Sequence, residues 1–299
     1  MKKNRREFLR FTGGLALGSI LAQTGCTSVK TGGSPEASGL PGSNYLKDFG
    51  LQLYTLRNDM PKDPAGILRQ VASFGYKQIE GYEGGKGMFW GMSNTDFKKF
   101  MDELGMNLVA SHCDINKDFE KKAAEAAEIG MKYLICPWLG PQKTMDDYKK
   151  AAEKFNKCGE ICKKEGILFA YHNHDYSFKP LGGQVPQEVM MNETDPALVD
   201  FEMDIYWVVT AGEDPENWVK KYKNRFRLCH VKDRSKTPVA DNSKNSVDLG
   251  TGSIDFKRIL KTALDNGMQY FIVEQEAYPN GTPLEAVKKN AEYMKKLKI

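Results

Sequence analysis

The sequence predicts a (β/α)8 barrel, because eight short apolar segments alternate with longer charged segments of helical period from Asp48 onward. The short segments have the length of buried strands. A doubly wound open sheet is the alternative, but that fold carries a GxGxxG motif after its first strand, which this chain lacks, and eight regular units are many for it. The predicted strands are residues 50–56, 77–81, 107–111, 133–137, 167–171, 199–204, 227–231 and 270–274.

The predicted helices lie between these strands and show the period of amphipathic surface helices. Several of them end with a glycine just before the next strand, and glycine commonly terminates helices because it adopts a left-handed backbone at low cost. These glycines are Gly75, Gly105, Gly130, Gly166 and Gly267. The predicted helices are residues 65–74, 94–104, 118–129, 146–164, 254–266 and 283–296.

The start of the chain differs in composition from the rest. Residues 1–26 combine basic side chains with an apolar, glycine-rich stretch at 11–23 that is too short to span a membrane. Residues 4–10 (NRREFLR) resemble a twin-arginine export signal; an amphipathic helix that carries two arginines by chance is the alternative. Cys26 resembles the cysteine of a bacterial lipoprotein signal, although Gln23 stands where leucine is usual.

These features predict an exported protein that is either periplasmic or lipid-anchored to the bacterial envelope. Its membrane contact would be limited to a lipid at Cys26. Residues 27–47 are rich in Gly, Ser, Thr and Pro and are expected to form a flexible linker. Residues 48–299 then form a single barrel domain.

The formal charge of +4 is concentrated at the start of the chain, since the first 26 residues contain five Lys or Arg residues and one Glu. The barrel region is therefore close to neutral. A nucleic-acid-binding domain needs a basic face for phosphate contacts, so this charge distribution argues against a nucleic-acid partner. The sequence leaves homo-oligomerisation open.

All four histidines of the chain fall at the carboxyl ends of predicted strands. In a (β/α)8 barrel those ends share one rim, and that rim carries the catalytic residues in enzymes of this fold. One histidine there would be interpreted as structural, but the joint placement predicts a functional site. His112 ends the third strand, His172 and His174 end the fifth, and His230 ends the seventh.

Acidic residues are predicted at the same rim. Asp204 closes the sixth strand, and Glu202 shares its face because side chains alternate along a strand. A buried carboxylate is costly unless it is paired or bound to a metal, and imidazoles together with carboxylates commonly hold a divalent cation. Surface ion pairs are the alternative, above all for Glu83. The other acids of this kind are Glu80, Glu274 and Glu276.

A series of short motifs lies at the predicted strand ends or in the loops after them. They are GLQLYTLR at 50–57, IEGY at 79–82, GMS at 91–93, SH at 111–112, YHNHD at 171–175, DIYW at 204–207, HVKD at 230–233, GTGSIDF at 250–256 and VE at 273–274. In their order and positions they resemble the sugar phosphate isomerase/epimerase family of xylose isomerase-like TIM barrels, and the resemblance extends over residues 49–297.

The resemblance implies one divalent metal ion at the ends of strands five to eight. In such enzymes the ion polarises a carbonyl group and stabilises the enediolate that forms when a neighbouring carbon loses its proton. Mixed nitrogen and oxygen ligands accommodate Mn, Co, Zn or Fe, and we favour Mn. The implied ligands are His172, Asp204, His230 and Glu274.

His172 departs from the family pattern, since epimerases usually carry glutamate there and use it with the strand-eight glutamate as an acid–base pair. A metal-bound imidazole transfers protons poorly. Glu274 would then be the sole base, with His174, His112 or Lys232 as the acid. One base and one acid suit a 1,2-elimination or a ketose–aldose shift at least as well as epimerisation. The catalytic candidates are Glu274, His172, His174 and Lys232.

Aromatic side chains near the rim indicate a carbohydrate ligand, because aromatic faces stack against sugar C–H surfaces. Trp90 lies in the loop after strand two and Trp138 follows strand four. Trp207 ends strand six, where many epimerases have histidine; core packing is the alternative for the last two. Lys232 either reaches a substrate oxygen or pairs with Asp233. The substrate-contact candidates are His112, Glu80, Trp90, Trp138, Trp207 and Gln52.

The sequence therefore predicts a divalent-metal-dependent isomerase or epimerase that removes a proton beside a metal-bound carbonyl of a sugar or keto-sugar. A lyase that cleaves 3-keto-glycosides by β-elimination is the first alternative, since some relatives do so and phosphorylated sugars are uncommon outside the cytoplasm. An exported carbohydrate-binding barrel without turnover is the second. A DNA-repair endonuclease is disfavoured by the neutral body. Residues 250–252 (GTG) are a weak candidate for a phosphate cradle.

Overall fold

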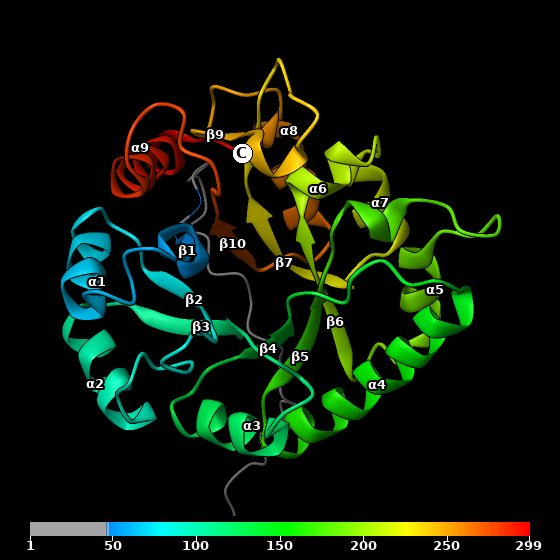
Figure 1. Ribbon diagram of the computed structural model, residues 1–299, viewed down its shortest axis with the longest axis horizontal. Coiled ribbons are helices and arrows are strands. Elements are labelled where there is room, and N and C mark those ends of the chain that lie inside the picture. The colour runs from blue at the N-terminus through cyan, green and yellow to red at the C-terminus, as the bar shows by residue number, and fades with distance from the viewer. Residues whose placement is uncertain (1–45, 47) are drawn as a thin grey trace, which may run out of the picture. The chain divides into compact units, whose positions relative to one another are not determined.

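The computed structural model describes residue 46 and residues 48–299, and these residues contain a closed barrel of eight parallel strands (Figure 1). The predicted (β/α)8 fold class is confirmed. The expected export signal at 1–26 and nearly all of the linker at 27–47 lie outside the described residues. In order around the barrel, the strands are β1 (Gly50–Gln52), β10 (Tyr270–Val273), β7 (Phe226–Val231), β6 (Val199–Asp204), β5 (Leu168–His172), β4 (Tyr133–Cys136), β3 (Asn107–His112) and β2 (Gln78–Tyr82).

Helices surround the barrel and connect its strands (Figure 1). The six predicted helices are present to within two residues at either end: α1 (Pro64–Ser73), α2 (Asn94–Glu103), α3 (Phe119–Glu128), α4 (Met145–Lys164), α8 (Phe256–Asp265) and α9 (Pro283–Lys296). Local sequence explains their starts. Thr144 and Thr282, for example, form capping boxes with Asp147 and Glu285 at the starts of α4 and α9.

Three short helices were not predicted. They are α5 (Pro186–Glu193), α6 (Ile205–Thr210) and α7 (Pro215–Lys221). Each has eight residues or fewer, so the periodic pattern is too short to stand out in the sequence. The helix α6 matters for the site, because it begins directly after β6 and carries Trp207, so this residue lies in a helix and not at the end of the strand.

The first strand is shorter than predicted. It ends at Gln52, and the chain continues as a 3-10 helix (Leu53–Leu56) where the sequence predicted strand up to residue 56. The side-chain oxygen of Gln52 accepts a hydrogen bond from the backbone N–H of Tyr54 at 2.9 Å, which stabilises the turn out of the sheet. This turn leaves Gln52 fully buried inside the barrel.

The barrel interior changes from apolar to polar along the strands. Ala170, Leu228 and Ile272 belong to an apolar interior group, and each precedes a polar residue of the rim by two positions on its strand. The other members of that group are Val109, Ala110, Tyr133 and Ile135. Side chains alternate along a strand, so the apolar group supports a polar layer at the carboxyl ends.

After β7, an antiparallel hairpin formed by β8 (Asp233–Arg234) and β9 (Ser246–Val247) extends the rim. Two further 3-10 helices follow rim strands or lie within this hairpin: Asp175–Phe178 and Asn242–Lys244. Among the described helices, none is long and apolar enough to cross a membrane.

Candidate active site

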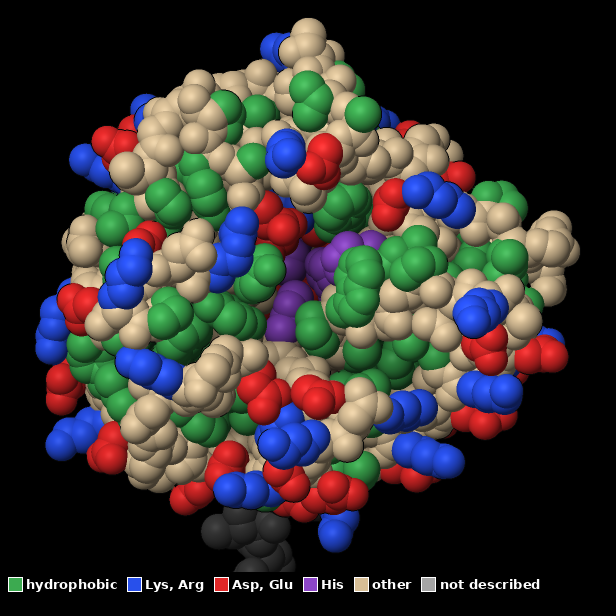
Figure 2. Space-filling view, in the orientation of Figure 1, with side chains coloured by type: hydrophobic (Ala, Val, Ile, Leu, Met, Phe, Trp, Pro, Cys, Tyr) green, Lys and Arg blue, Asp and Glu red, His purple; other side chains and the backbone are tan. Residues whose placement is uncertain are grey.

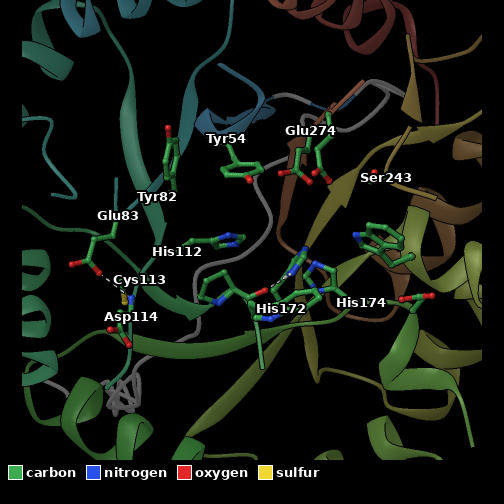
Figure 3. A pocket seen from close by; sticks show the side chains of 15 residues that line it. Tyr54, Tyr82, Glu83, His112, Cys113, Asp114, His172, His174, Ser243 and Glu274 are labelled. Atoms are coloured by element: carbon green, nitrogen blue, oxygen red, sulfur yellow. Dashed lines mark hydrogen bonds between the residues drawn. The ribbon is translucent and has the colours of Figure 1, made fainter. Parts of the chain in front are cut away.

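A cavity of about 750 Å³ opens at the carboxyl ends of the strands. In the space-filling view, histidine side chains lie at the bottom of the hollow, with acidic side chains next to them (Figure 2). Figure 3 shows His112 and His172 pointing into this space, with Tyr54 and Glu274 above them. The lining residues are Tyr54, Tyr82, Glu83, His112, Cys113, Asp114, Pro137, Trp138, His172, His174, Asp175, Trp207, Ser243, Glu274 and Glu276.

The four histidines meet in one group although they come from three strands. The ring centroids of His172 and His230 are 4.6 Å apart, and those of His172 and His174 are 4.8 Å apart. His112 stacks on His230 at 5.4 Å. Their common position at the strand ends, read from the sequence, therefore corresponds to a common position in space.

Three of the four implied metal ligands form a compact donor set. The donor atoms of His172, Asp204 and His230 all lie within 4.8 Å of one another. His172 Nε2 is 3.5 Å from Asp204 Oδ2, which in turn is 3.7 Å from His230 Nδ1. Ligands bonded to a divalent transition metal at roughly 2.1 Å are separated by roughly 3.0 to 3.5 Å, so only small shifts would be needed to bind an ion here.

The hydrogen bond of His172 to the backbone leaves its other ring nitrogen available to bind a metal ion. Its Nδ1 atom lies 3.2 Å from the carbonyl oxygen of Pro137, which can only accept, so Nδ1 carries the proton and Nε2 carries the lone pair. Burial, together with neighbouring His230 and His112, lowers the pKa of His172 to about 4, although Asp204 acts in the opposite direction. The ring is therefore neutral at pH 7, as metal binding requires.

His230 has a carboxylate at each ring nitrogen. Its Nδ1 atom is 3.0 Å from Glu274 Oε2, and its Nε2 atom is 2.7 Å from Glu80 Oε1. Burial alone would lower the pKa of His230, but Glu202, Glu274 and Glu80 raise it well above its usual value. Glu274, the fourth implied ligand, adjoins the donor set through this contact rather than belonging to the group of three.

Lys232 lies beneath the cavity and is only 1% exposed. Its Nζ atom is 3.0 Å from Asp204 Oδ2, 3.0 Å from Glu274 Oε2 and 2.6 Å from Glu276 Oε1. Burial opposes its charge, but these three carboxylates raise the pKa of Lys232 well above its usual value. The alternative of a pair with Asp233 is wrong, because that carboxylate instead accepts hydrogen bonds from four backbone N–H groups.

A second polar group lies within the barrel, next to the donor set. His112 Nε2 is 2.8 Å from Glu202 Oε2 and 3.1 Å from Glu80 Oε1, while Gln52 Nε2 donates to Glu80 Oε1 at 2.5 Å. Glu80, His112, Glu202 and His230 also offer donor atoms within 4.8 Å of one another. Their distances match hydrogen bonds, so the group positions the two imidazoles.

In this second group, burial and neighbouring charges shift the pKa values of the side chains in different directions. Burial raises the pKa of Glu202 to about 8, with Glu80 adding to the effect. Burial would also raise the pKa of Glu80, but His112 and His230 lower it well below its usual value. For His112, burial acts downward and the two carboxylates outweigh it, so its pKa rises to about 9.

The aromatic candidates separate into two environments. Trp138 lines the cavity, is 57% exposed, and is fixed by edge contacts with His174 at 4.4 Å and Tyr176 at 5.1 Å. Trp207 also lines the cavity. Trp90, in contrast, is buried in the core against Tyr82 at 5.0 Å and does not line the cavity.

The other expected substrate contacts and the catalytic candidate His174 divide in the same way. His112 and His174 line the cavity, whereas Gln52 and Glu80 are buried beneath its surface. Glu83, for which a surface ion pair was the alternative, does pair with Lys122 at 2.6 Å.

Several site residues received no role from the sequence. Glu202 was placed on the correct strand face, but only the structure shows that it holds His112. The period-two pattern counted back from Asp204 is the signal that identifies it. The lining residues without an assigned role include Tyr54, Tyr82, Asp114, Asp175 and Ser243. Tyr82 ends β2, and the other four lie in loops or 3-10 helices, where sequence periodicity gives no direction.

The fold and the rim site define a barrel with a candidate metal centre, and comparison with known proteins identifies the family. Residues 68–297 match the family Xylose isomerase-like TIM barrel, and the chain belongs to it. This agrees with the resemblance found in the motifs.

Solved structures show the same relationship. A sugar phosphate isomerase/epimerase from Parabacteroides distasonis ATCC 8503 is 31% identical, with a TM-score of 0.70 over 87% of this chain and 97% of that one. A second structure with the same description and source is 32% identical, with a TM-score of 0.72 over 83% and 97% of the two chains.

Among curated proteins, the inosose dehydratase of Clostridium perfringens is 31% identical over 164 residues, which cover 50% of this chain and 54% of the relative. The chain thus spans about half the length of the curated relatives it matches. These relatives are named as dehydratases of inosose, a sugar-like compound.

Proposed function

We propose that this protein is a divalent-metal-dependent enzyme that removes the proton next to a carbonyl group of a keto-sugar or related ring and completes a 1,2-elimination. The observation that carries this proposal is the position of Glu274. Its carboxylate lines the cavity, and its Oε2 atom lies 3.0 Å from His230 Nδ1, beside the donor set. This position supports a role for Glu274 as the group that acts on a ring held over the histidines.

The residues that would hold the ion are His172, Asp204, His230 and Glu274. Two nitrogen and two oxygen donors accommodate Mn, Co, Zn or Fe, and Mn remains our first choice. When bound, the ion supplies polarisation of the substrate carbonyl, which acidifies the neighbouring C–H group.

Elimination fits the acid–base groups better than two-base epimerisation. Glu274 serves as the base that takes the proton from carbon. The position at the end of β5 holds His172, whose only free nitrogen faces the donor set, so it does not act as a second base. His112 lines the cavity and its Nε2 atom is engaged by Glu202 and Glu80, which leaves Nδ1 to donate a proton to a leaving oxygen.

Curated relatives support this reaction type, since their name, inosose dehydratase, denotes loss of water from a keto-cyclitol. β-Elimination from a 3-keto-glycoside is the same chemistry with an alcohol as the leaving group. Isomerisation or epimerisation is the second candidate, favoured by the description of the Parabacteroides distasonis structures. The non-catalytic alternative is a barrel that binds carbohydrate without turnover.

The test is incubation of the metal-loaded protein with inososes, 3-keto-glycosides and simple ketoses in deuterated water, followed by NMR. Elimination gives an unsaturated ketone together with water or a released alcohol. Deuterium incorporation without loss of a group would instead favour isomerisation or epimerisation. If no substrate exchanges a proton and nothing is released, the enzyme proposal fails and the binding role remains.

Two substitutions assign roles within that assay. His230→Ala should abolish exchange and lose the metal, whereas Glu274→Ala should abolish exchange through loss of the base. The surface substitution Asp102→Asn, in an ion pair with Lys98, is the control for both. Stoichiometric metal in the His230 variant would remove that residue from the ligand set.

For location, the proposal remains export by the signal at residues 1–26, with either a periplasmic product or a lipid anchor at Cys26. The basic start, the apolar stretch at 11–23 and the twin-arginine pattern at 4–10 support it. Export of a folded protein would allow the metal to be bound in the cytoplasm. Fractionation of cells that express the wild-type chain and a variant with Arg5 and Arg6 changed to Lys tests it.

A further inference from the structure

The cavity presents carboxylates to a ligand. Among the described residues that line it, none is a lysine or an arginine. Recognition of a phosphate group usually relies on such cations or on several free backbone amides. The acidic lining residues are Glu83, Asp114, Asp175, Glu274 and Glu276.

The lysines next to this cavity are already engaged by those carboxylates. Lys122 Nζ lies 2.6 Å from Glu83 Oε2, and Lys179 Nζ lies 2.5 Å from Asp175 Oδ2. Lys232 is buried between three carboxylates. Each of these ammonium groups is paired with a carboxylate, and none of the three lysines belongs to the cavity lining.

Arg57 also forms its contacts within the chain. Its guanidinium donates to the backbone carbonyl oxygens of Tyr54 at 3.1 Å and Glu276 at 3.0 Å, and it lies over the Tyr54 ring at 4.8 Å. It joins the first and last strand ends of the rim, and its charge is not directed at a ligand.

The backbone amides that often bind phosphate in barrels are occupied from within the chain. In many (β/α)8 enzymes the loops after strands seven and eight form the phosphate site. Here the GTG loop at 250–252 follows strand seven, and its amides bind Asp233: the N–H groups of Gly250 and Gly252 each donate to Oδ2 at 2.9 Å. Ile254 N–H donates to Oδ1 at 3.2 Å and Arg234 N–H at 2.8 Å.

A bound metal ion would not give the site an excess of positive charge. The two charges of a divalent ion would be matched by Asp204 and Glu274, and that of Lys232 by Glu276. His112, which lines the cavity, is paired with Glu80 at 3.1 Å. Size does not exclude a phosphorylated ligand either, because about 750 Å³ holds a ligand larger than one sugar ring. Charge therefore decides the selection.

From these observations we infer that the site takes uncharged, unphosphorylated sugars or glycosides and rejects phosphorylated ones. The inference specifies the substrate class of the proposed function and rests on the same cavity. It separates this chain from what the words sugar phosphate, in the description of its structural neighbours, would suggest.

The test is a binding measurement on the metal-loaded full chain, with methyl β-glucoside, its 6-phosphate and inorganic phosphate as probes. The phosphorylated glucoside should bind at least about tenfold more weakly than the neutral one, because like charges face each other across the contact. Inorganic phosphate should not compete with the neutral glucoside. Equal or tighter binding of the 6-phosphate would overturn the inference, as would failure of the neutral glucoside to bind at millimolar concentration.

A charge substitution checks the cause. Asp175→Asn removes a lining carboxylate and frees the charge of Lys179, so discrimination against the 6-phosphate should fall by a factor of about three to ten. The control is Asp102→Asn, which removes the same charge from an ion pair with Lys98 on α2 and should leave discrimination unchanged. Equal discrimination in both variants would contradict a role for the lining charge.

This outcome is independent of catalysis. If the neutral probe is preferred but no keto-sugar exchanges a proton in deuterated water, the proposed reaction fails and the ligand class stands. If exchange occurs and the phosphorylated probe is preferred, the reaction stands and the ligand class fails.

Discussion

The Nε2 atom of His230 lies 2.7 Å from Oε1 of Glu80, while the Nδ1 atom of the same ring faces the candidate metal-binding group. A carboxylate at the far nitrogen fixes the orientation of a ligating imidazole and increases its basicity. Glu80→Gln should therefore weaken metal binding by roughly 10- to 100-fold without removing a ligand. Calorimetric titration with Mn²⁺ or Co²⁺ measures this effect.

The control is Glu128→Gln, because Glu128 accepts a hydrogen bond from Asn94 on the outside of the barrel at 2.8 Å. It should bind metal like the wild type. Unchanged affinity in the Glu80 variant would show that the buried group stabilises the fold and has no influence on the ion.

A substitution at Gly252 tests how much the loop that binds Asp233 contributes to stability. A Cβ atom added at Gly252 would collide with the carboxylate of Asp233 and the carbonyl oxygen of Arg234. Gly252→Ala should lower the free energy of unfolding by about 1 to 3 kcal/mol through overpacking. Chemical denaturation measures this, and Gly85→Ala is the control, since a Cβ there meets no described atom within 4 Å. Equal stability of the two variants would show that the loop adjusts to the added methyl group without a loss of stability.

Asp200 predicts a pH dependence of stability away from the donor set. It accepts a hydrogen bond from Tyr133 at 2.8 Å inside the barrel, and burial raises its pKa to about 6 despite that bond. Because the folded-state pKa exceeds the unfolded one, the folded protein keeps a proton that the unfolded chain has released. The resulting stability is fully present below about pH 4 and is lost as the pH rises through about 6.

The loss should amount to as much as about 3 kcal/mol relative to Asp200→Asn, which does not titrate. Urea unfolding of both proteins at pH 4.5 and pH 7.5 measures about 2 kcal/mol of this loss, since the unfolded carboxyl is already mostly ionised at pH 4.5. Comparison within each pH cancels all other titrating groups. A stability difference that stays constant between the two pH values would exclude the raised pKa.

The barrel could be predicted because its signals are local and repeated. Each of the six predicted helices has a periodic apolar face and several have a terminal glycine, so the alternating units could be counted without knowing their contacts. The same periodicity placed all four histidines at one rim. It failed where a side chain overrides it, as at Gln52, whose hydrogen bond to Tyr54 ends the first strand early.

Depth within the site could not be read from the sequence. Strand periodicity assigns a side chain to the interior but does not say whether it reaches the cavity or lies beneath it. Glu80 was expected to contact substrate and Lys232 was a catalytic candidate, yet both are buried below the lining. Register shifts between strands occur next to Glu80 and Glu202, and such irregularities redirect side chains in ways that sequence spacing does not encode.

Trp138 predicts where a second ring of a glycoside would bind. Its side chain is 57% exposed at the cavity and is held by edge contacts with His174 and Tyr176, so it offers a fixed aromatic surface. Trp138→Ala should weaken binding of an aryl glucoside by about 2- to 10-fold, the equivalent of about 0.5–1.5 kcal/mol for an aromatic contact, and affect methyl glucoside less.

Because the Trp138 side chain is exposed, the free energy of unfolding of this variant should change by less than about 0.5 kcal/mol. Leu168→Ala, 44% exposed at the start of β5 and thus at the other end of the barrel, is the control. An equal loss of affinity for both glucosides would place Trp138 at the inner ring instead.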